Sequence, residues 1–105
     1  MPTLDEMYDE ASKLKSAGNL PDAVAKLEEI LQLDSGHVLA HSALAVNFQK
    51  LGKPEKAIEL AIRVTELEPN DGFSFTQLSV IYQRCGKITE VEDAMAKAHE
   101  MQARR

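Results

Sequence analysis

Two histidines stand close enough along the chain to share a metal ion if the segment between them is helical. His37 and His41 are four residues apart, a spacing that places two side chains on one face of a helix. No glutamate follows His37, so the pair lacks the H-E-x-x-H pattern of helical zinc sites. His41 also falls on a predicted packing position. A structural role for His41 is therefore favoured, and we expect no metal ion.

The single cysteine, Cys85, is the other candidate for chemistry. Arg84 and Lys87 lie nearby and could lower the pKa of its thiol, as basic side chains do around reactive cysteines. A lone cysteine at a helix end more often has no special reactivity. The chain also contains no phosphate-binding loop and no nucleophile motif. We therefore expect neither enzymatic activity nor a cofactor.

Charge and cysteine content limit the partners and the compartment. The 105 residues include 17 acidic and 12 basic ones, which gives a net charge of −5. Binding to nucleic acid calls for a basic stripe, so we expect no such partner. One cysteine cannot form an internal disulfide, which fits a cytoplasmic setting. The acidic N-terminus is unlike a signal peptide, and no run approaches the roughly 18 apolar residues of a membrane helix.

Three glycines recur at a fixed interval, because Gly18, Gly52 and Gly86 are each 34 residues apart. Packing residues keep the same register around each glycine. The residues four before and five, nine and twelve after are Leu14, Ala23, Leu27 and Ile30; Phe48, Ala57, Ala61 and Val64; and Tyr82, Val91, Met95 and Ala98. A period held at this many positions in three copies is typical of a stacked repeat array.

Each copy contains two segments of helical length, one on either side of its glycine. Thr3 and Glu6 form a capping box, Asn19 can cap the second helix, and the glycines supply the left-handed conformation that ends a helix. We expect helices over about 4–17, from about 19 to 33, on both sides of Gly52, and over about 71–85 and 88–103. Helices of about 14 residues are marginal alone in water, so packing between neighbours must stabilise them.

This period and the helix–glycine turn–helix unit resemble the tetratricopeptide repeat, whose pattern is W-x-x-L-G-x-x-Y, then G, A-x-x-x-F, A and P. The second copy is similar at His41, Leu44, Ala45, Phe48, Gly52, Ala57, Ala61, Val64 and Pro69, and the third at Phe75, Leu78, Ser79, Tyr82, Gly86, Val91, Met95 and Ala98. The first copy departs from the pattern at Glu10, where the family has Leu. The resemblance implies an all-α fold, a right-handed α-solenoid of three helix-turn-helix hairpins. It implies one domain over 1–105, with repeats at about 4–37, 38–71 and 72–105.

In this family the first helix of each repeat lines a concave groove that binds other polypeptides. The resemblance assigns these residues to the groove: Tyr8, Ser12, Lys15, Leu39, Ser42, Val46, Gln49, Phe73, Thr76, Val80 and Gln83. An apolar strip edged by hydroxyls and amides suits an extended or helical peptide with apolar anchors. The alternative for Val46 and Val80 is that they only fill space between neighbouring first helices.

Relatives that bind chaperone C-terminal tails use a clamp of Lys, Asn and Arg in the groove. Here Tyr8, Ser12, Ser42 and Val46 occupy those positions, so we expect no ligand of that type. The leading functional hypothesis is an adaptor or scaffold that binds a protein or peptide partner in the groove.

The alternative is a structural or accessory subunit of a larger complex, including self-association. Its candidate contacts are Leu60 and Ile62, where the convex face is usually polar, and Met95 and Met101 of the terminal helix. The competing expectation for the terminal helix is that it caps the stack. Glu92 and His99 are polar at positions that would otherwise face a further repeat.

Overall fold

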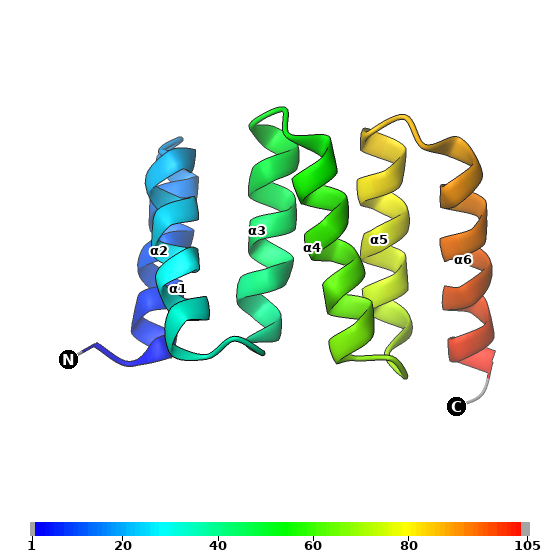
Figure 1. Cartoon of the computed structure of the whole chain (residues 1–105), viewed down its shortest axis with the longest axis horizontal. Coiled ribbons are helices and arrows are strands. Elements are labelled where there is room, and N and C mark those ends of the chain that lie inside the picture. Colours follow the sequence, from blue (N-terminus) through cyan, green and yellow to red (C-terminus); the bar gives the residue numbers. More distant parts are fainter. Residues whose placement is uncertain (1, 104–105) are drawn as a thin grey trace.

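The computed structural model describes residues 2–103, and these residues form six helices in a row of three hairpins (Figure 1). The part of the chain that is described contains no strand, which confirms the prediction of an all-α repeat fold. None of the described helices is long and apolar enough to cross a membrane. The helices are α1 (Leu4–Ser16), α2 (Leu20–Leu33), α3 (Val38–Lys50), α4 (Pro54–Leu67), α5 (Gly72–Arg84) and α6 (Ile88–Ala103).

The three glycines end the first helix of each hairpin, as predicted. Gly18, Gly52 and Gly86 have φ angles of 81°, 75° and 77°, in the left-handed region where a side chain would be strained. At the first turn, the N–H of Gly18 donates to the carbonyl of Lys15, and the N–H of Asn19 donates to the carbonyl of Leu14. This pair of bonds is a Schellman motif, which satisfies the last carbonyls of the helix.

The helices differ in how their N-termini are capped. The predicted capping box of Thr3 and Glu6 is present, and Asp71 accepts a hydrogen bond from the N–H of Phe73 at the start of α5. Asn19 is the N-cap residue of α2, as predicted, but its side chain accepts no hydrogen bond from the first turn. Its Nδ2 donates to Oδ2 of Asp22 at 2.7 Å, and its backbone is outside the extended conformation typical of a capping residue.

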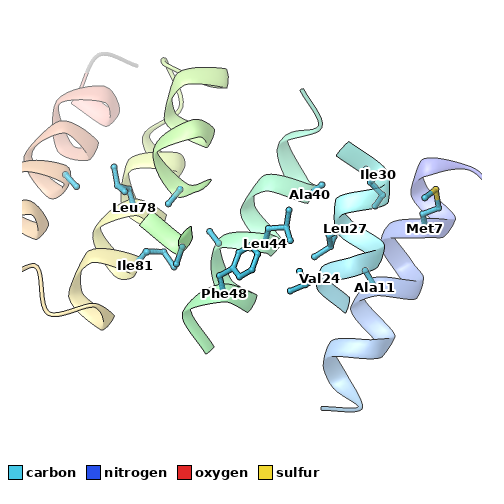
Figure 2. Packing of buried hydrophobic residues seen from close by; sticks show 14 residues of the cluster. Met7, Ala11, Val24, Leu27, Ile30, Ala40, Leu44, Phe48, Leu78 and Ile81 are labelled. Carbon is cyan, nitrogen blue, oxygen red and sulfur yellow. The ribbon is translucent and has the colours of Figure 1, made fainter. Parts of the chain in front are cut away.

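Buried apolar side chains form a core that continues from α1 to α6 (Figure 2). Ala23 and Ala57 are completely buried, and their small size lets the paired helices approach closely. Leu44 and Phe48 of α3 belong to the same cluster as Leu27 of α2. The helix α3 contacts α2, α4 and α5 and therefore has neighbours on more than one side.

The first repeat departs from the family pattern at a solvated position. Glu10 is exposed on α1, and its carboxylate lies 3.5 Å from Nζ of Lys26 on α2. Met7 and Ala11 provide the buried contacts of that helix. Glu10 therefore links α1 to α2 at the surface, and the neighbouring residue Ala11 makes the buried apolar contact.

The terminal helix α6 packs closely against α5, so only part of it is available for contact with a partner. Met101 is 7% exposed, and a Cβ added to Gly72 would lie 3.5 Å from Cβ of Met101. The expectation that Met101 remains exposed is wrong, because the missing side chain of Gly72 lets α6 approach the start of α5. Met95 is 47% exposed, and Glu92 and His99 are also at the surface. The outer face of α6 is therefore largely polar.

Candidate binding face

The two histidines hold the backbone at the start of α3. Nδ1 of His37 accepts a hydrogen bond from the N–H of Ala40 at 3.1 Å. Nε2 of His41 lies 3.0 Å from the carbonyl oxygen of Ser35, and it donates because a carbonyl can only accept. His41 is 7% exposed, in agreement with its predicted packing position. Residues 2–103 contain no group of three or more His, Cys, Asp or Glu side chains placed to hold a metal ion.

The surroundings of Cys85 do not lower the pKa of its thiol, although its neighbours Arg84 and Lys87 in the sequence suggested that they could. Its Sγ is 4.0 Å from the carbonyl oxygen of Pro54 on α4. Burial raises the pKa of the thiol, and this effect outweighs the lowering by Lys87. A raised pKa reduces the thiolate fraction at neutral pH, so the basic neighbours do not activate this cysteine.

Five of the predicted groove residues line one cavity, which we call the junction pocket. Tyr8, Ser12 and Lys15 come from α1, and Ser42 and Val46 come from α3. The cavity has a volume of about 220 Å³, and its other lining residues are Ala11, Leu27, Ala43, Asn47 and Gln77. Side chains of α1, α3 and α5 therefore meet at one cavity.

The apolar groove candidates are mostly at the surface. Leu39 at the start of α3 is 57% exposed, and Phe73 at the start of α5 is 69% exposed. Val80 is 38% exposed and Val46 is half-buried. The hypothesis that these two valines only fill space fits Val46 better than Val80. Leu39 and Phe73 are therefore exposed apolar side chains at equivalent positions of successive repeats.

The remaining groove candidates are Gln49, Thr76 and Gln83. The first two form hydrogen bonds within the chain, and the third is exposed. Gln49 accepts a hydrogen bond from Arg84, with Nη1 and Oε1 3.3 Å apart. Thr76 donates to the carbonyl of Gly72 and lines a second cavity, of about 230 Å³, together with Met95. Gln83 is exposed. The structure therefore separates these residues from the junction pocket.

The contact between the second and third hairpins, which we call the second junction, is closed by polar and apolar contacts. Gln77 donates through Nε2 to the carbonyl of Ser42 at 3.2 Å and accepts from the Ser42 hydroxyl at 3.1 Å. Ile81 lies in the core with 1% exposure. Gln77 was not among the residues predicted from the sequence, although its polar side chain on the predicted groove helix was the available signal.

The contact between the first and second hairpins, the first junction, is built differently. Asn47 occupies the position in α3 that Ile81 occupies in α5, five residues before the glycine. Asn47 is 1% exposed, and its Oδ1 has no hydrogen-bond partner among the described residues. Sequence analysis also missed Asn47. The signal that could have found it is a polar residue at a position where the next repeat is aliphatic.

A third cavity, of about 590 Å³, lies over the outer face of α4. It is lined by His41, Ile58, Leu60 and Ile62 and by charged residues of the same helix. Ile62 is 37% exposed, whereas Leu60 is half-buried and packs against the core. Of the two aliphatic side chains predicted for a secondary contact on this face, only Ile62 is therefore exposed.

The comparison with protein families assigns the chain to one of them. The model of the tetratricopeptide repeat matches residues 14–75, more than half of the chain. The chain belongs to the tetratricopeptide repeat family. Six described helices correspond to about three such repeats.

Individual relatives extend the same assignment. The chain is 28% identical over 90 residues to a probable UDP-N-acetylglucosamine–peptide N-acetylglucosaminyltransferase SPINDLY of Petunia hybrida. The match covers 84% of this tetratricopeptide repeat chain but only 9% of the transferase. The chain therefore spans about a tenth of the length of that relative.

Two solved structures of similar fold belong to proteins that bind peptides. The second tetratricopeptide domain of Spaghetti (RPAP3), bound to the HSP90 peptide SRMEEVD, superposes with a TM-score of 0.80 at 15% identity, over 93% of this chain and 91% of that one. YrrB, a tetratricopeptide protein with an unusual peptide-binding site, superposes with a TM-score of 0.84 at 19% identity, over 98% of this chain and 53% of that one. At such identities the likeness establishes the fold alone.

Proposed function

We propose that this tetratricopeptide repeat array is an adaptor that binds a peptide or protein segment on the face lined by α1, α3 and α5. The observation that carries the proposal is the combination of the junction pocket with the exposed side chains of Leu39 and Phe73 on that face. Extended segments bind such surfaces through apolar anchors and polar contacts to the chain between them. The peptide-bound RPAP3 domain, which has the same fold, supports this role.

The proposed role is binding and not catalysis. The SPINDLY match covers 9% of that transferase, so nothing of its catalytic activity transfers to this chain. The raised pKa of the Cys85 thiol argues against a cysteine nucleophile. We also propose that the repeats, at about 4–37, 38–71 and 72–105, act as a single domain, because buried residues from all six helices form one cluster.

Capture of peptides from a random-sequence library tests the adaptor role. The captured peptides should lose most of their affinity for a Phe73→Ala variant, since this side chain is the largest exposed apolar group on the proposed face. Leu33→Ala is the matched control, because Leu33 is 64% exposed on α2, outside the proposed face. Peptides that bind Phe73→Ala as tightly as the unchanged chain would contradict the proposal.

The alternative role, an accessory subunit, has two exposed aliphatic side chains in its favour. Ile62 is 37% exposed on α4, and Met95 is 47% exposed on α6. Solution mass measurement of the unchanged chain and of Ile62→Glu and Met95→Glu tests this alternative. An oligomer or a complex that dissociates with either substitution, but not with Phe73→Ala, would favour the accessory role.

A further inference from the structure

Two helices of the proposed binding face carry no negative charge, although the chain as a whole is acidic. Neither α3 nor α5 contains an aspartate or a glutamate, whereas the whole chain has 17 acidic residues. Each of the two helices ends in a cation, Lys50 on α3 and Arg84 on α5. The helix α1 differs, because it contains Asp and Glu residues and ends in Ser16. The charge of the face is therefore set by its second and third repeats.

Each of these two helices has a stripe of residues that begins apolar and ends basic. Phe73 and Arg84 are eleven residues apart on α5, which is about three helical turns, so they lie on one side of the helix. Leu39 and Lys50 have the same spacing on α3. All four residues are exposed. At a rise of 1.5 Å per residue, the apolar and basic ends of each stripe are roughly 17 Å apart.

The second and third glycine turns lie at the same edge of the array (Figure 1). Sγ of Cys85 in the third turn is 4.0 Å from the carbonyl oxygen of Pro54, which follows the second turn. Nη1 of Arg84 donates to Oε1 of Gln49 at 3.3 Å. These contacts hold the cations of the two turns at one edge. We call them the basic edge: Lys50, Lys53, Lys56, Arg84 and Lys87.

Few carboxylates are present to neutralise the basic edge. Within residues 49–56 and 83–90, the carboxylates are those of Glu55 and Glu90. The five cations form no salt bridge with any described residue. The ammonium groups of Lys53 and Lys56 lie 5.9 and 5.3 Å from the centre of the Phe48 ring. The ring attracts these ammonium groups but leaves their charge in place.

The helix dipole accounts for only part of this charge. Lys50 and Arg84 stand in the last turn of their helices, where cations are favourable. Lys53 is the N-cap residue of α4, and Lys56 lies in its first turn, where the dipole disfavours a cation. Helix stability therefore does not explain these two lysines. An anion at this edge interacts favourably with both the lysines and the N-terminus of α4.

We propose that the bound segment has two parts, an apolar residue that contacts Phe73 or Leu39 and acidic residues that pair with the basic edge. In an extended segment the two parts are about five residues apart, because each residue advances about 3.3 Å. The basic edge does not include the positions of the clamp in tail-binding relatives, so the acidic residues need no chain terminus. This inference rests on the proposed adaptor function, and it names the chemical class of the partner.

Two designed peptides, both amidated at the C-terminus, test the spacing. One has two phenylalanines, a five-residue glycine–serine spacer and four glutamates. The other has the same composition, with the glutamates directly after the phenylalanines. By fluorescence anisotropy, the spaced peptide should bind about tenfold more tightly, since only it reaches both ends of a stripe. Its affinity should fall as the ionic strength rises. Equal affinities, or no binding of either peptide, would overturn the proposal.

Reversing two charges of the basic edge tests the acidic part. Lys53→Glu combined with Lys87→Glu should weaken binding of the spaced peptide about tenfold. The midpoint of thermal unfolding should not fall, because a carboxylate near a helix N-terminus is favourable. Arg63→Glu combined with Lys97→Glu is the matched control, with the same change in net charge at exposed sites on α4 and α6. An equal loss of binding in the control would contradict the proposal.

Other anionic partners are tested with the unchanged chain. The probes are vesicles of phosphatidylserine and phosphatidylcholine in equal parts, and a single-stranded RNA. Binding of either probe more tightly than the spaced peptide would overturn the proposal, because the edge would then serve a lipid surface or a nucleic acid. The expected result is tighter binding of the spaced peptide, since the apolar end of the stripe adds to its affinity.

The library capture separates failure of this inference from failure of the adaptor role. Captured peptides that lose affinity for Phe73→Ala but share no acidic residues would refute the acidic part and leave the adaptor role standing. Captured peptides that share acidic residues about five positions from an apolar residue would support both. A library that yields no binder would refute the adaptor role and this inference with it.

Discussion

The two junctions of the array join equivalent helices of successive hairpins but differ in their chemistry. At the second junction, Ile81 fills the core, and Gln77 joins α5 to Ser42 of α3 through two hydrogen bonds. At the first junction, Asn47 stands in the place of Ile81, and a cavity of about 220 Å³ remains. No hydrogen bond between side chains of α1 and α3 is found among residues 2–103.

This difference indicates that the two junctions contribute unequally to the stability of the array. Apolar burial and satisfied polar groups stabilise a junction, whereas an unsatisfied buried amide and a cavity destabilise it. The second junction therefore supports the stack, and the first junction gives up stability in the region where we propose that a ligand binds.

Giving the second junction the chemistry of the first should have the largest effect. Ile81→Asn removes a fully packed aliphatic side chain and buries an amide in its place. We expect the free energy of unfolding to fall by about 3–5 kcal/mol, measured by urea denaturation. A loss below about 1 kcal/mol would mean that the second junction tolerates a polar core residue and that the contrast is not one of stability.

Overpacking the hairpin shared by both junctions should have an intermediate effect. Ala57 is completely buried in α4, and Ala57→Leu has no space for the added carbons. We expect a loss of about 1–3 kcal/mol in the same assay. Ala25→Leu, at an exposed site on α2, serves as the control and should change little. A melting curve for Ala57→Leu that matches the unchanged chain would argue against the close packing of α3 and α4.

Removing the polar link of the second junction should have a smaller effect. Gln77→Ala deletes both hydrogen bonds to Ser42, and we expect a loss of about 1–2 kcal/mol, since each such bond contributes about 1 kcal/mol. Ser12→Ala on α1 makes the corresponding change at the first junction. It should shift stability by less than about 0.5 kcal/mol. Equal losses for the two variants would erase the difference between the junctions.

The smallest effect is expected for the alkylation rate of Cys85, which depends on how deeply the thiol is buried next to α4. Burial raises the pKa of this thiol, so alkylation by iodoacetamide should reach its maximal rate at a higher pH than for a free peptide thiol. The folded chain holds the proton more tightly than the unfolded chain, and stability therefore falls as the pH rises through this range. An alkylation profile shifted to lower pH would contradict this environment.

The sequence was sufficient for the fold because the repeat is specified by local signals. The glycines at 18, 52 and 86 allow the left-handed conformation that ends a helix, and Thr3 with Glu6 sets the start of α1. Asn19 shows the limit of local reasoning. Its side chain is able to cap a helix, but a carboxylate three residues away offered a competing partner.

The candidate site was predictable only in part. The register of Tyr8 and Ser42 places them on one face, because the repeats stack with a constant period. The cavity depends on how much volume neighbouring helices leave between them, and that volume depends on contacts between repeats. The burial of Met101 against Gly72 depends on such a contact too. Spacing within one repeat does not contain this information.

The most direct test of the account is a map of amide chemical shifts on addition of a captured peptide. We expect the largest changes at Tyr8, Ser12 and Ser42, on both sides of the first junction, with smaller changes near Phe73. Changes confined to the neighbourhood of Ile62 on α4 or Met95 on α6, with none between α1 and α3, would contradict it.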